Sequence, residues 1–468
     1  MSPCDGATTV REVVEPAECD LVIEGGWTLD PYVDDPAATD PRSVAIMGRH
    51  IVDVGPTTSI RQRWQPRRRI DATGAVISPG FVDAHVHLGA FLGVMTPYER
   101  PTRPSPFGGS GDPQEALRKV AGFCSMPVPD EIMTALLRPA LAAMLRSGFT
   151  GVVDAGGPGR EGAWQAAVDL GIRAAIGPSL ADRWHDEAGT YATHADADQL
   201  LADAESFLAS HTGRSSTVVP LVSAVETLGS SDALLSGIAT LAGTHDSPIH
   251  VHSHINRTDH DWSVAVYGKG PTARLNDNGL LSPRTTIMHA GTLSDCDVST
   301  FAASGITVNH NPVGNGLYGF GVAAGRSIPR LAHAGVPIVL GSDWTPAVTS
   351  PFEIVRSALL LHRDAAANDL VLTLEDALQM ATNGGVALGS PGRLGRLVHG
   401  QLADIVVIAL SGSHHLASNH PIPATALHAR SSDVTTVIVD GRVVVQDGAL
   451  LTADENLLVE EARSATGS

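Results

Sequence analysis

The 468-residue sequence lacks several features, and each absence excludes a class of protein. It contains only four cysteines, which are scattered and form no Cys-x-x-Cys pair: Cys4, Cys19, Cys124 and Cys296. A disulfide-rich scaffold is therefore excluded, and free thiols in a reducing compartment are expected. No run of about 18 apolar residues is present, so no membrane span is expected. The N-terminal segment is acidic and lacks the apolar region of a signal peptide, so a cytoplasmic protein is expected.

Basic residues are also scarce, because 31 Lys and Arg stand against 50 Asp and Glu, which gives a formal net charge of −19. Nucleic acid and anionic membranes both require basic surfaces, so neither is expected as a partner. Hydrophobic residues make up 43% of the chain, which is enough for a sizeable core in one large domain or two. This composition fits an enzyme that acts on a small, neutral or cationic molecule.

Both ends of the chain have the pattern of short strands separated by tight turns. Residues 19–79 contain apolar or alternating runs bounded by Gly, Asp and Pro, and residues 400–448 repeat this pattern. The turn at 439–442 lies between two Val-rich runs and indicates a hairpin. We therefore predict a small β-sandwich domain formed by both chain ends, from residues 1–79 and 396–468.

The middle of the chain, residues 80–395, alternates short apolar runs with helical patterns. About eight strand candidates alternate with helices, which predicts a (β/α)8 TIM barrel of the α/β class. A doubly wound sheet lacks support, because no Gly-x-Gly-x-x-Gly follows an early strand. In a barrel the carboxyl ends of the strands build the active site, so polar residues that end the apolar runs are the candidates for function.

The most informative segment, residues 79–88, is an apolar run that begins with a Pro-Gly turn and contains a His-x-His pair. Residues two apart in a strand point to the same face, so His85 and His87 would present two imidazoles side by side. Neutral imidazoles that are held rigidly suit a divalent metal ion.

Three later apolar runs also end in polar residues. His250, His252 and His254 alternate on one face of a strand candidate, whereas His289 and Asp343 each end a separate run. A lone residue of this kind is more often a core histidine or a helix cap. Together with the His-x-His pair, and in this order, these residues predict a metal site at the strand ends.

These motifs resemble those of the metal-dependent amidohydrolase superfamily. Residues 79–87 are similar to its first-strand signature, and the Leu-Gly-Ser-Asp at 340–343 resembles its eighth-strand position. Residues 381–407 resemble the segment that leaves the barrel and re-enters the β domain, and residues 267–291 resemble the chlorohydrolase and deaminase branch. The resemblance extends over about residues 20–450.

The resemblance implies one divalent metal ion per chain, with zinc as the first choice and cobalt, iron or manganese as alternatives. The ligands that it implies are His85, His87, His252 and Asp343. It also implies that Asp343 takes a proton from water and that His289 orients the water or the developing oxyanion. Two-metal relatives often carry a lysine on the fourth strand, and residues 218–226 contain none. This favours a single ion, although Glu226 leaves a bridged pair open.

One position departs from the deaminase pattern. That branch usually carries a glutamate three residues after His252, where this sequence has Ile255. His254, Glu226 and His310 are the candidates to replace it in proton transfer, and the sequence does not decide between them. We retain His254 as a candidate catalytic residue.

Ile255 in place of the glutamate favours hydrolysis of an amide, urea, carbamate or thiocarbamate-type C–N bond in a small non-peptide molecule. In such a reaction one carboxylate can make both proton transfers. Molinate hydrolase and the phenylurea hydrolases are similar proteins of that kind. The alternative is a hydrolytic deaminase or dechlorinase of a triazine, purine or pyrimidine-type ring. A non-enzymatic scaffold is disfavoured, because every core ligand position is filled.

Aromatic and histidine side chains near predicted strand ends are candidates for substrate binding: Phe91, Trp184, His185, His310 and Trp344. The Pro- and Gly-rich segment 88–130 is predicted to form a lid over the barrel mouth. The adjacent His414 and His415 are expected to be exposed in a strand and to make a poor metal site, because neighbours in a strand point to opposite faces. By resemblance, a homo-oligomer, either a dimer or a tetramer, is expected.

Overall fold

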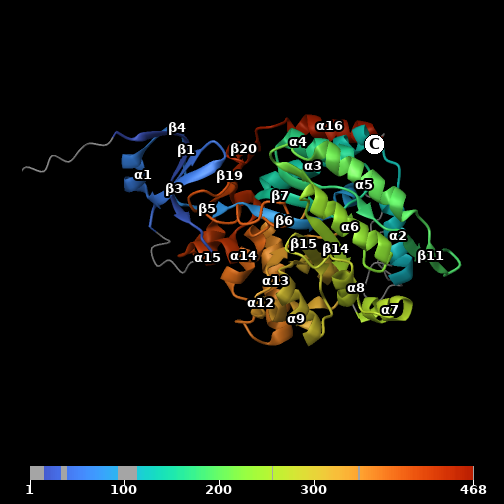
Figure 1. The fold of residues 1–468 in the computed structure, drawn as a ribbon. Coiled ribbons are helices and arrows are strands. Elements are labelled where there is room, and N and C mark those ends of the chain that lie inside the picture. Colours follow the sequence, from blue (N-terminus) through green and yellow to red (C-terminus); the bar gives the residue numbers. More distant parts are fainter. Residues whose placement is uncertain (1–14, 33–39, 93–112, 256, 346–347, 467–468) are drawn as a thin grey trace, which may run out of the picture.

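The computed structural model describes residues 15–32, 40–92, 113–255, 257–345 and 348–466. It combines a barrel of parallel strands, surrounded by helices, with a β-sheet assembled from both ends of the chain (Figure 1). In Figure 1 this sheet, in blue and red, lies to one side of the barrel. The predicted α/β class is confirmed.

The barrel has eight strand positions, and its hydrogen-bonded neighbours are parallel. In chain order they are β6 (Phe81–Val86), β7 (Phe149–Asp154), β8 (Arg173–Ile176) with β9 (Ser179–Leu180), β12 (Val218–Pro220) with β13 (Val222–Ala224), β14 (Ile249–Ser253), β15 (Thr285–His289), β16 (Thr307–His310) and β17 (Ile338–Leu340). The circuit closes between β17 and β6, where Val86 pairs with Asp343. The predicted (β/α)8 barrel is confirmed.

The third and fourth strand positions are interrupted at the same level. A Cβ at Gly177 would lie 1.8 Å from the Leu221 carbonyl oxygen, so glycine is required where the two strands approach. The Leu221 amide donates to Ile176 at 3.1 Å and the Ser223 amide donates to Pro178 at 3.0 Å. The barrel wall is therefore continuous through the interruption.

Helices follow the barrel strands and surround them (Figure 1). Three of them begin with a capping box, in which Ser294, Ser350 or Thr373 accepts a hydrogen bond from the backbone three residues later. The helices between the barrel strands and after them are α2 (Pro113–Cys124), α3 (Asp130–Arg146), α4 (Arg160–Leu170), α5 (Ala197–His211), α6 (Asp232–His245), α7 (Arg257–Tyr267), α8 (Pro271–Asp277), α9 (Asp295–Ser304), α10 (Pro312–Tyr318), α11 (Val322–Gly325), α12 (Ser327–His333), α13 (Pro351–Ala366) and α14 (Leu374–Thr382).

Nine strands from both chain ends form the second sheet, in the order β21-β20-β19-β18-β5-β1-β2-β3, with β4 paired to β1. Their bounds are β1 (Ala17–Thr28), β2 (Arg42–Met47), β3 (His50–Pro56), β4 (Trp64–Asp71), β5 (Ala75–Pro79), β18 (Ile405–Ala409), β19 (Val434–Val439), β20 (Arg442–Gln446) and β21 (Ala449–Leu450). The predicted hairpin at 439–442 joins β19 to β20.

Strand β1 turns a corner in this sheet and so gives it two layers. Its first part pairs with β2 and β4, and its end at Trp27 and Thr28 pairs with β5, with a register shift between Ile23 and Gly26. A Cβ at Gly26 would lie 2.7 Å from the Ile77 side chain. Glycine at the corner therefore allows one strand to serve both layers of the predicted sandwich.

A buried network of charges joins this sheet to the amino end of barrel strand β8. Arg173 donates to both carboxylate oxygens of Asp404 at 2.8 Å and to Asp440 at 3.1 Å. The three residues are buried, and the Asp440 amide donates to Asp404 at 2.9 Å. The terminal sheet is thus fixed at the amino ends of the barrel strands, away from the carboxyl ends that carry active sites in this fold.

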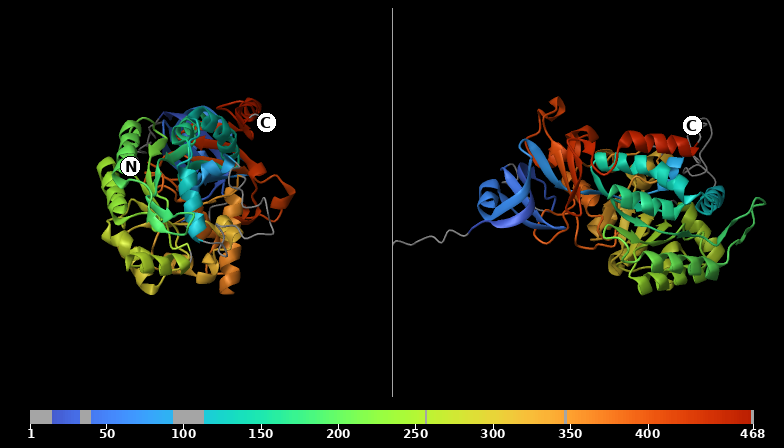
Figure 2. Two further views of the ribbon diagram at one scale, coloured as in Figure 1. Left: turned by 90° about the vertical axis from the view of Figure 1, so that its right-hand side faces the viewer. Right: turned by 90° about the horizontal axis from the view of Figure 1, so that it is seen from above.

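The last helix, α16 (Glu455–Thr466), lies on the barrel. Arg138 and Arg146 of α3 form ion pairs with Glu461 and Glu455 at 3.2 and 2.8 Å. Figure 2 shows α16, in red, alongside the barrel helices. The C-terminal segment therefore supplies both sheet strands and one helix of the barrel exterior.

The predicted lid, residues 88–130, lies partly outside the described residues, which stop at 92 and resume at 113. Its described parts are the short helix η1 (Leu88–Leu92), helix α2 and the turn before α3. Phe91 is partly buried and packs against the main core. The lid itself remains a prediction.

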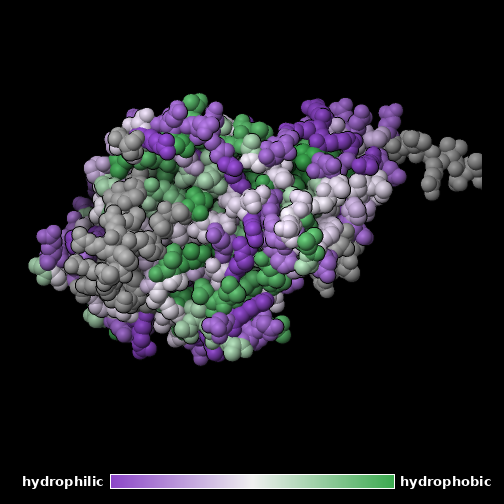
Figure 3. All heavy atoms as spheres, turned by 180° about the vertical axis from the view of Figure 1, so that it is seen from behind, coloured by the Kyte–Doolittle hydropathy of each residue, from purple (hydrophilic) through white to green (hydrophobic). Residues whose placement is uncertain are grey.

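No helix among the described residues is long and apolar enough to cross a bilayer. On the face in Figure 3, patches of hydrophobic residues alternate with hydrophilic ones. The predicted homo-oligomer remains a prediction.

Candidate active site

Buried histidines and one aspartate meet at the carboxyl ends of the barrel strands. Two overlapping groups have ligand atoms within 4.8 Å of one another: His85, His252 and His289, and His85, His87 and Asp343. All five residues are buried, and His252, the most exposed, is only 9% exposed. Strands β6, β14 and β15 and the loop after β17 thus bring together the five residues that the strand-end pattern singled out.

The distances within this cluster suit a shared ion. The Nε2 atoms of His85 and His87 each lie 3.5 Å from Oδ1 of Asp343. The His85 ring is 4.7 Å from the His252 ring and 6.0 Å from the His289 ring. A tetrahedral zinc ion with bonds of about 2.0–2.1 Å to nitrogen holds its ligand atoms a little over 3 Å apart. Small rotations of these side chains would therefore bring their ligand atoms to the distances that zinc requires.

Buried polar atoms in the cluster lack hydrogen bonds among the described residues. Both ring nitrogens of His85 and Nδ1 of His87 have none. A buried polar atom without a partner costs free energy, so native structures rarely leave one unless an ion or water satisfies it. The donor set of imidazole nitrogens and one carboxylate therefore fits a divalent transition-metal ion.

The pKa values in the cluster match the ionisation states that metal ligands need. Burial lowers the pKa of His85 to about 4 and holds the pKa of His252 well below its ordinary value. Burial alone would raise the pKa of Asp343, but the nearby imidazoles of His85, His87 and His289 keep it well below normal. The lowered pKa values of His85 and His252 favour neutral imidazoles, and that of Asp343 favours an ionised carboxylate.

The backbone holds Asp343 in an unusual conformation. Its φ is 69°, in the left-handed region that non-glycine residues rarely adopt. Its amide donates to the His85 carbonyl at 2.8 Å, and a Cβ at Gly314 would lie 2.5 Å from the Asp343 Cβ. The barrel closure and the glycine contact together fix the carboxylate against the histidines.

Two supporting residues were not identified from the sequence. Asp83 accepts hydrogen bonds from the Ser342 amide at 2.9 Å and the Ser342 hydroxyl at 2.6 Å, which fixes the loop before Asp343. Its place two residues before His85, on the same strand face, was a signal that could have revealed it. Asn315 Oδ1 lies 2.9 Å from His289 Nδ1, and no local pattern marks that residue.

Aromatic side chains surround the cluster on one side. The Trp344 ring lies 4.9 Å from the His87 ring and 4.9 Å from the Phe123 ring. The Phe320 ring stands edge-on to His289 at 5.5 Å. Trp344 thus lies beside a candidate metal ligand, whereas Phe91 packs into the core, and a role in substrate binding remains a prediction for both.

The remaining substrate-binding candidates make other contacts. Trp184 and His185 lie in β10 (Arg183–His185), which pairs with β11 (Tyr191–Thr193). Trp184 stacks on His194 at 4.7 Å, and His185 contacts Trp262 at 4.3 Å. His310 Nε2 lies 3.0 Å from His362 Nε2. Their roles at the site remain predictions.

His254 is held within the protein by its own partners. Its Nδ1 lies 2.8 Å from the Ser253 hydroxyl, its Nε2 lies 3.0 Å from the Thr272 hydroxyl, and its ring contacts Phe301. Burial lowers the pKa of His254 to about 4. With both nitrogens engaged by hydroxyls, His254 fits a structural role better than the catalytic role considered above.

A pair of acidic residues lies near the position of the missing glutamate. Glu226 follows β13, and the amide of the next residue, Thr227, donates to the His252 carbonyl at 3.2 Å. Asp259 is buried and accepts a hydrogen bond from the Ile255 amide at 2.7 Å. Burial and then the charge of Asp259 raise the pKa of Glu226 well above its usual value. This shift favours the neutral, protonated form of Glu226.

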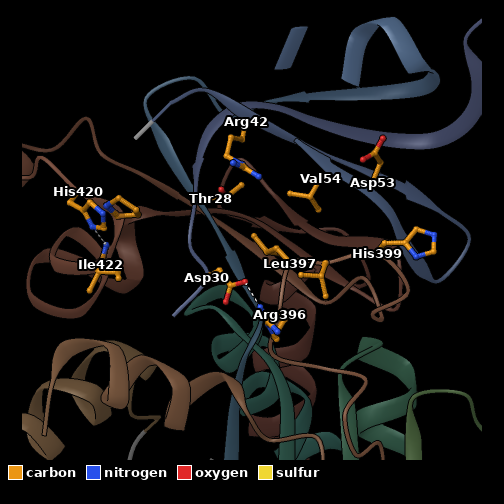
Figure 4. Close-up of a pocket in the computed structure, with 12 residues that line it drawn as sticks. Thr28, Asp30, Arg42, Asp53, Val54, Arg396, Leu397, His399, His420 and Ile422 are labelled. Atoms are coloured by element: carbon orange, nitrogen blue, oxygen red, sulfur yellow. Dashed lines mark hydrogen bonds and ion pairs between the residues drawn. The ribbon is translucent and has the colours of Figure 1, made fainter. Parts of the chain in front are cut away.

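A separate cavity of about 380 Å³ lies beside the terminal sheet (Figure 4). Arg396 and Asp30 form an ion pair of 2.8 Å in its wall. Its lining contains none of the barrel cluster residues and consists of Thr28, Asp30, Arg42, Asp53, Val54, Arg396, Leu397, Val398, His399, His420, Pro421 and Ile422. This cavity is therefore distinct from the candidate active site.

The fold and the cluster define a metal-dependent hydrolase of the barrel type. The chain belongs to the amidohydrolase family, because the model of that family matches residues 76–444. The superfamily and the branch predicted from the sequence motifs are thus confirmed, as is an enzyme that acts on C–N bonds.

The similarity to known proteins and solved structures extends over nearly the whole chain. A 5-methylthioadenosine/S-adenosylhomocysteine deaminase from Syntrophobacter fumaroxidans is 29% identical over 96% of this chain and 98% of its own. A 5'-deoxyadenosine deaminase from Methanosarcina mazei is 27% identical over 95% and 97%. An adenosine deaminase structure from Xanthomonas campestris with bound zinc has a TM-score of 0.82 at 25% identity, over 97% and 99% of the two chains.

The fold is also shared with a chlorohydrolase. The atrazine chlorohydrolase of Arthrobacter aurescens TC1, solved with zinc, superposes with a TM-score of 0.81 at 23% identity and covers 95% of this chain and 99% of its own. At this identity the likeness shows the fold alone.

Proposed function

We propose that this enzyme is a hydrolytic deaminase that replaces the exocyclic amino group of a heteroaromatic ring, in an adenine-type nucleoside, with oxygen from water and releases ammonia. The observation that carries the proposal is the buried cluster of His85, His87, His252, His289 and Asp343 in a chain that aligns end to end with adenosine-type deaminases. The relatives favour this alternative over the amide interpretation that Ile255 suggested.

The cluster can supply the groups that this reaction needs. His85, His87, His252 and Asp343 would hold a divalent ion, which would supply a water of lowered pKa. Because Asp343 Oδ1 faces His85 and His87, Oδ2 is the oxygen that takes the proton from water and passes it to the leaving amino group. With Nδ1 held by Asn315, His289 would use Nε2 to orient the attacking water.

Glu226 is our candidate to replace the glutamate that is missing at position 255. A ring nitrogen must be protonated as the ring carbon becomes tetrahedral, which requires a neutral acid close to the fifth strand. Glu226 lies next to the residue that bonds to the His252 backbone, and its pKa is raised by burial and by Asp259. The raised pKa favours the protonated form of Glu226, which can donate a proton to the ring nitrogen.

Replacing Glu226 with glutamine is expected to lower kcat for an aminopurine by about 10²-fold with little change in KM, because the acid is lost and the shape is kept. The alkaline limb of the pH–rate profile, set by loss of the Glu226 proton, is expected to disappear. Glu205→Gln, an exposed change on α5, is the matched control. An unchanged kcat in the Glu226 variant would exclude Glu226 as the acid.

Hydrolysis of an amide, urea or carbamate remains the second candidate, and Ile255 is the observation that favours it. Such a reaction needs no ring-nitrogen acid, since Asp343 can make both proton transfers. The two candidates differ in their products, because a phenylurea yields an aniline whereas an aminopurine yields a hydroxypurine and ammonia.

The test is ammonia release by zinc-loaded enzyme from adenosine, 5'-deoxyadenosine and methylthioadenosine, with a phenylurea and a carbamate assayed in parallel. We expect one ammonia per aminopurine consumed and no ammonia from inosine, which lacks the amino group. Removal of the metal with a chelator is expected to abolish turnover, and added zinc to restore it. Turnover of the urea or carbamate alone would favour the second candidate.

A further inference from the structure

A second group of potential metal ligands lies outside the barrel strands, in the segment that joins β18 to β19. His414, His415 and Asp433 each offer one ligand atom, and these atoms lie within 4.8 Å of one another. The Nε2 atoms of His414 and His415 lie 2.9 and 3.0 Å from Asp433 Oδ2. None of the three residues belongs to the active-site cluster.

The structure contradicts the expectation that these histidines are exposed in a strand. They lie in η2 (Ser413–His415), a tight 3-10 turn, and His415 is only 3% exposed. Asp433 ends η4 (Ser431–Asp433), a second short turn. The alternation that separates neighbours in a strand does not apply to a turn, so both rings can face one carboxylate. Their centroids are 4.3 Å apart.

Hydrogen bonds alone do not account well for this arrangement. Asp433 Oδ2 also accepts the Arg430 amide at 2.8 Å, so three nitrogens surround one oxygen that has two lone pairs. If both imidazoles carried a proton on Nε2, three donors would compete for these lone pairs. An imidazole without that proton would turn its own lone pair towards the carboxylate. A cation between the three atoms removes both conflicts.

Further contacts orient the ligands. The Ser418 hydroxyl lies 3.4 Å from His415 Nδ1 and 2.7 Å from His428 Nδ1. With Nδ1 engaged on this side, Nε2 of His415 faces Asp433, while the Arg430 amide holds the carboxylate. Metal-binding histidines are usually oriented in this way by a partner on the other ring nitrogen.

We propose that His414, His415 and Asp433 bind a second divalent transition-metal ion, of the zinc or nickel class, separate from the ion at the barrel mouth. Two imidazoles and one carboxylate select such ions over magnesium or calcium. The His414 side chain is 22% exposed, so solvent reaches the site and water completes the coordination. The ion links η2 to η4 and so holds together the segment between β18 and β19.

The test is zinc content measured by elemental mass spectrometry, after metal removal and dialysis against buffered free zinc. We expect about two zinc ions per chain in the wild type and about one in His414→Gln. The double variant His85→Gln/His87→Gln, which removes barrel ligands, is expected to keep about one. His333→Gln changes an exposed histidine on α12 and is the matched control, with an expected content of two.

Equal zinc contents of the wild type and His414→Gln would overturn this proposal. Should His414→Gln fail to fold, calorimetric titration of zinc into His85→Gln/His87→Gln replaces it, and the absence of a binding event would refute the second site. Deaminase activity is expected to be unchanged in His414→Gln, so failure of the second site and failure of the proposed function give different results.

Discussion

Replacing Asp343 with asparagine is expected to lower kcat/KM by about 10³-fold or more while the fold is kept. In the proposed mechanism the carboxylate has two tasks. One oxygen faces the imidazoles of His85 and His87, and the other would carry the proton between water and the leaving group. General acid–base catalysis by one positioned group contributes about 10²–10⁴-fold, and weaker metal binding adds to the loss. The amide keeps the side-chain shape but cannot take up the proton.

The measurement is steady-state kinetics on the best aminopurine substrate at saturating zinc, with circular dichroism to check the fold. Asp246→Asn, which changes a side chain that is 95% exposed, serves as the control and is expected to retain wild-type activity. A kcat/KM within about tenfold of the wild type in the Asp343 variant would contradict the proton-transfer role, because a positioned acid–base group contributes more than that.

Replacing Arg173 with methionine is expected to lower the free energy of unfolding by about 3–5 kcal/mol. Arg173 is the only cation that the structure records within hydrogen-bonding distance of Asp404, and it also bonds to Asp440. Its loss leaves Asp404 buried without a cation between the barrel and the terminal sheet, whereas Asp440 keeps its ion pair with Arg49 at 2.8 Å. Methionine keeps the apolar stem, so the effect reports the charge rather than packing.

Chemical or thermal unfolding of the metal-loaded protein checks this prediction. Arg146→Met is the matched control, because its ion pair with Glu455 is about half exposed and pairs of that kind contribute about 0–1 kcal/mol. Equal shifts for the two variants would contradict a special role of the buried network. Activity that survives the loss of stability in the Arg173 variant would indicate that the network fixes the sheet without shaping the active site.

The core of the candidate site could be predicted because its signals are local. His85 and His87 share a strand face whatever the rest of the chain does, since the two-residue repeat is a property of extended backbone. His252, His289 and Asp343 end apolar runs, and the barrel topology brings all such ends to one face. These two rules were sufficient to place five residues in one cluster.

Other site predictions stayed open because they depend on contacts between distant segments. His254 shares the strand pattern of His252, but its φ of 56° and the hydroxyls of Ser253 and Thr272 hold it in a separate environment. The raised pKa of Glu226 depends on burial and then on Asp259, more than thirty residues away along the chain. Ser253 is adjacent to His254, but Thr272 and Asp259 are too far along the chain for a short local pattern to reveal these contacts.

The sequence by itself determined the class of fold, the metal-binding character of the strand ends and the family, because periodicity and short motifs are encoded in neighbouring residues. The tertiary structure alone decided which histidines meet. It closed the barrel through the Val86–Asp343 pair, engaged His254 with hydroxyls, and gathered His414 and His415 on Asp433. These side-chain contacts depend on long-range packing. Turn geometry and burial there override the alternation of side chains that a strand would impose.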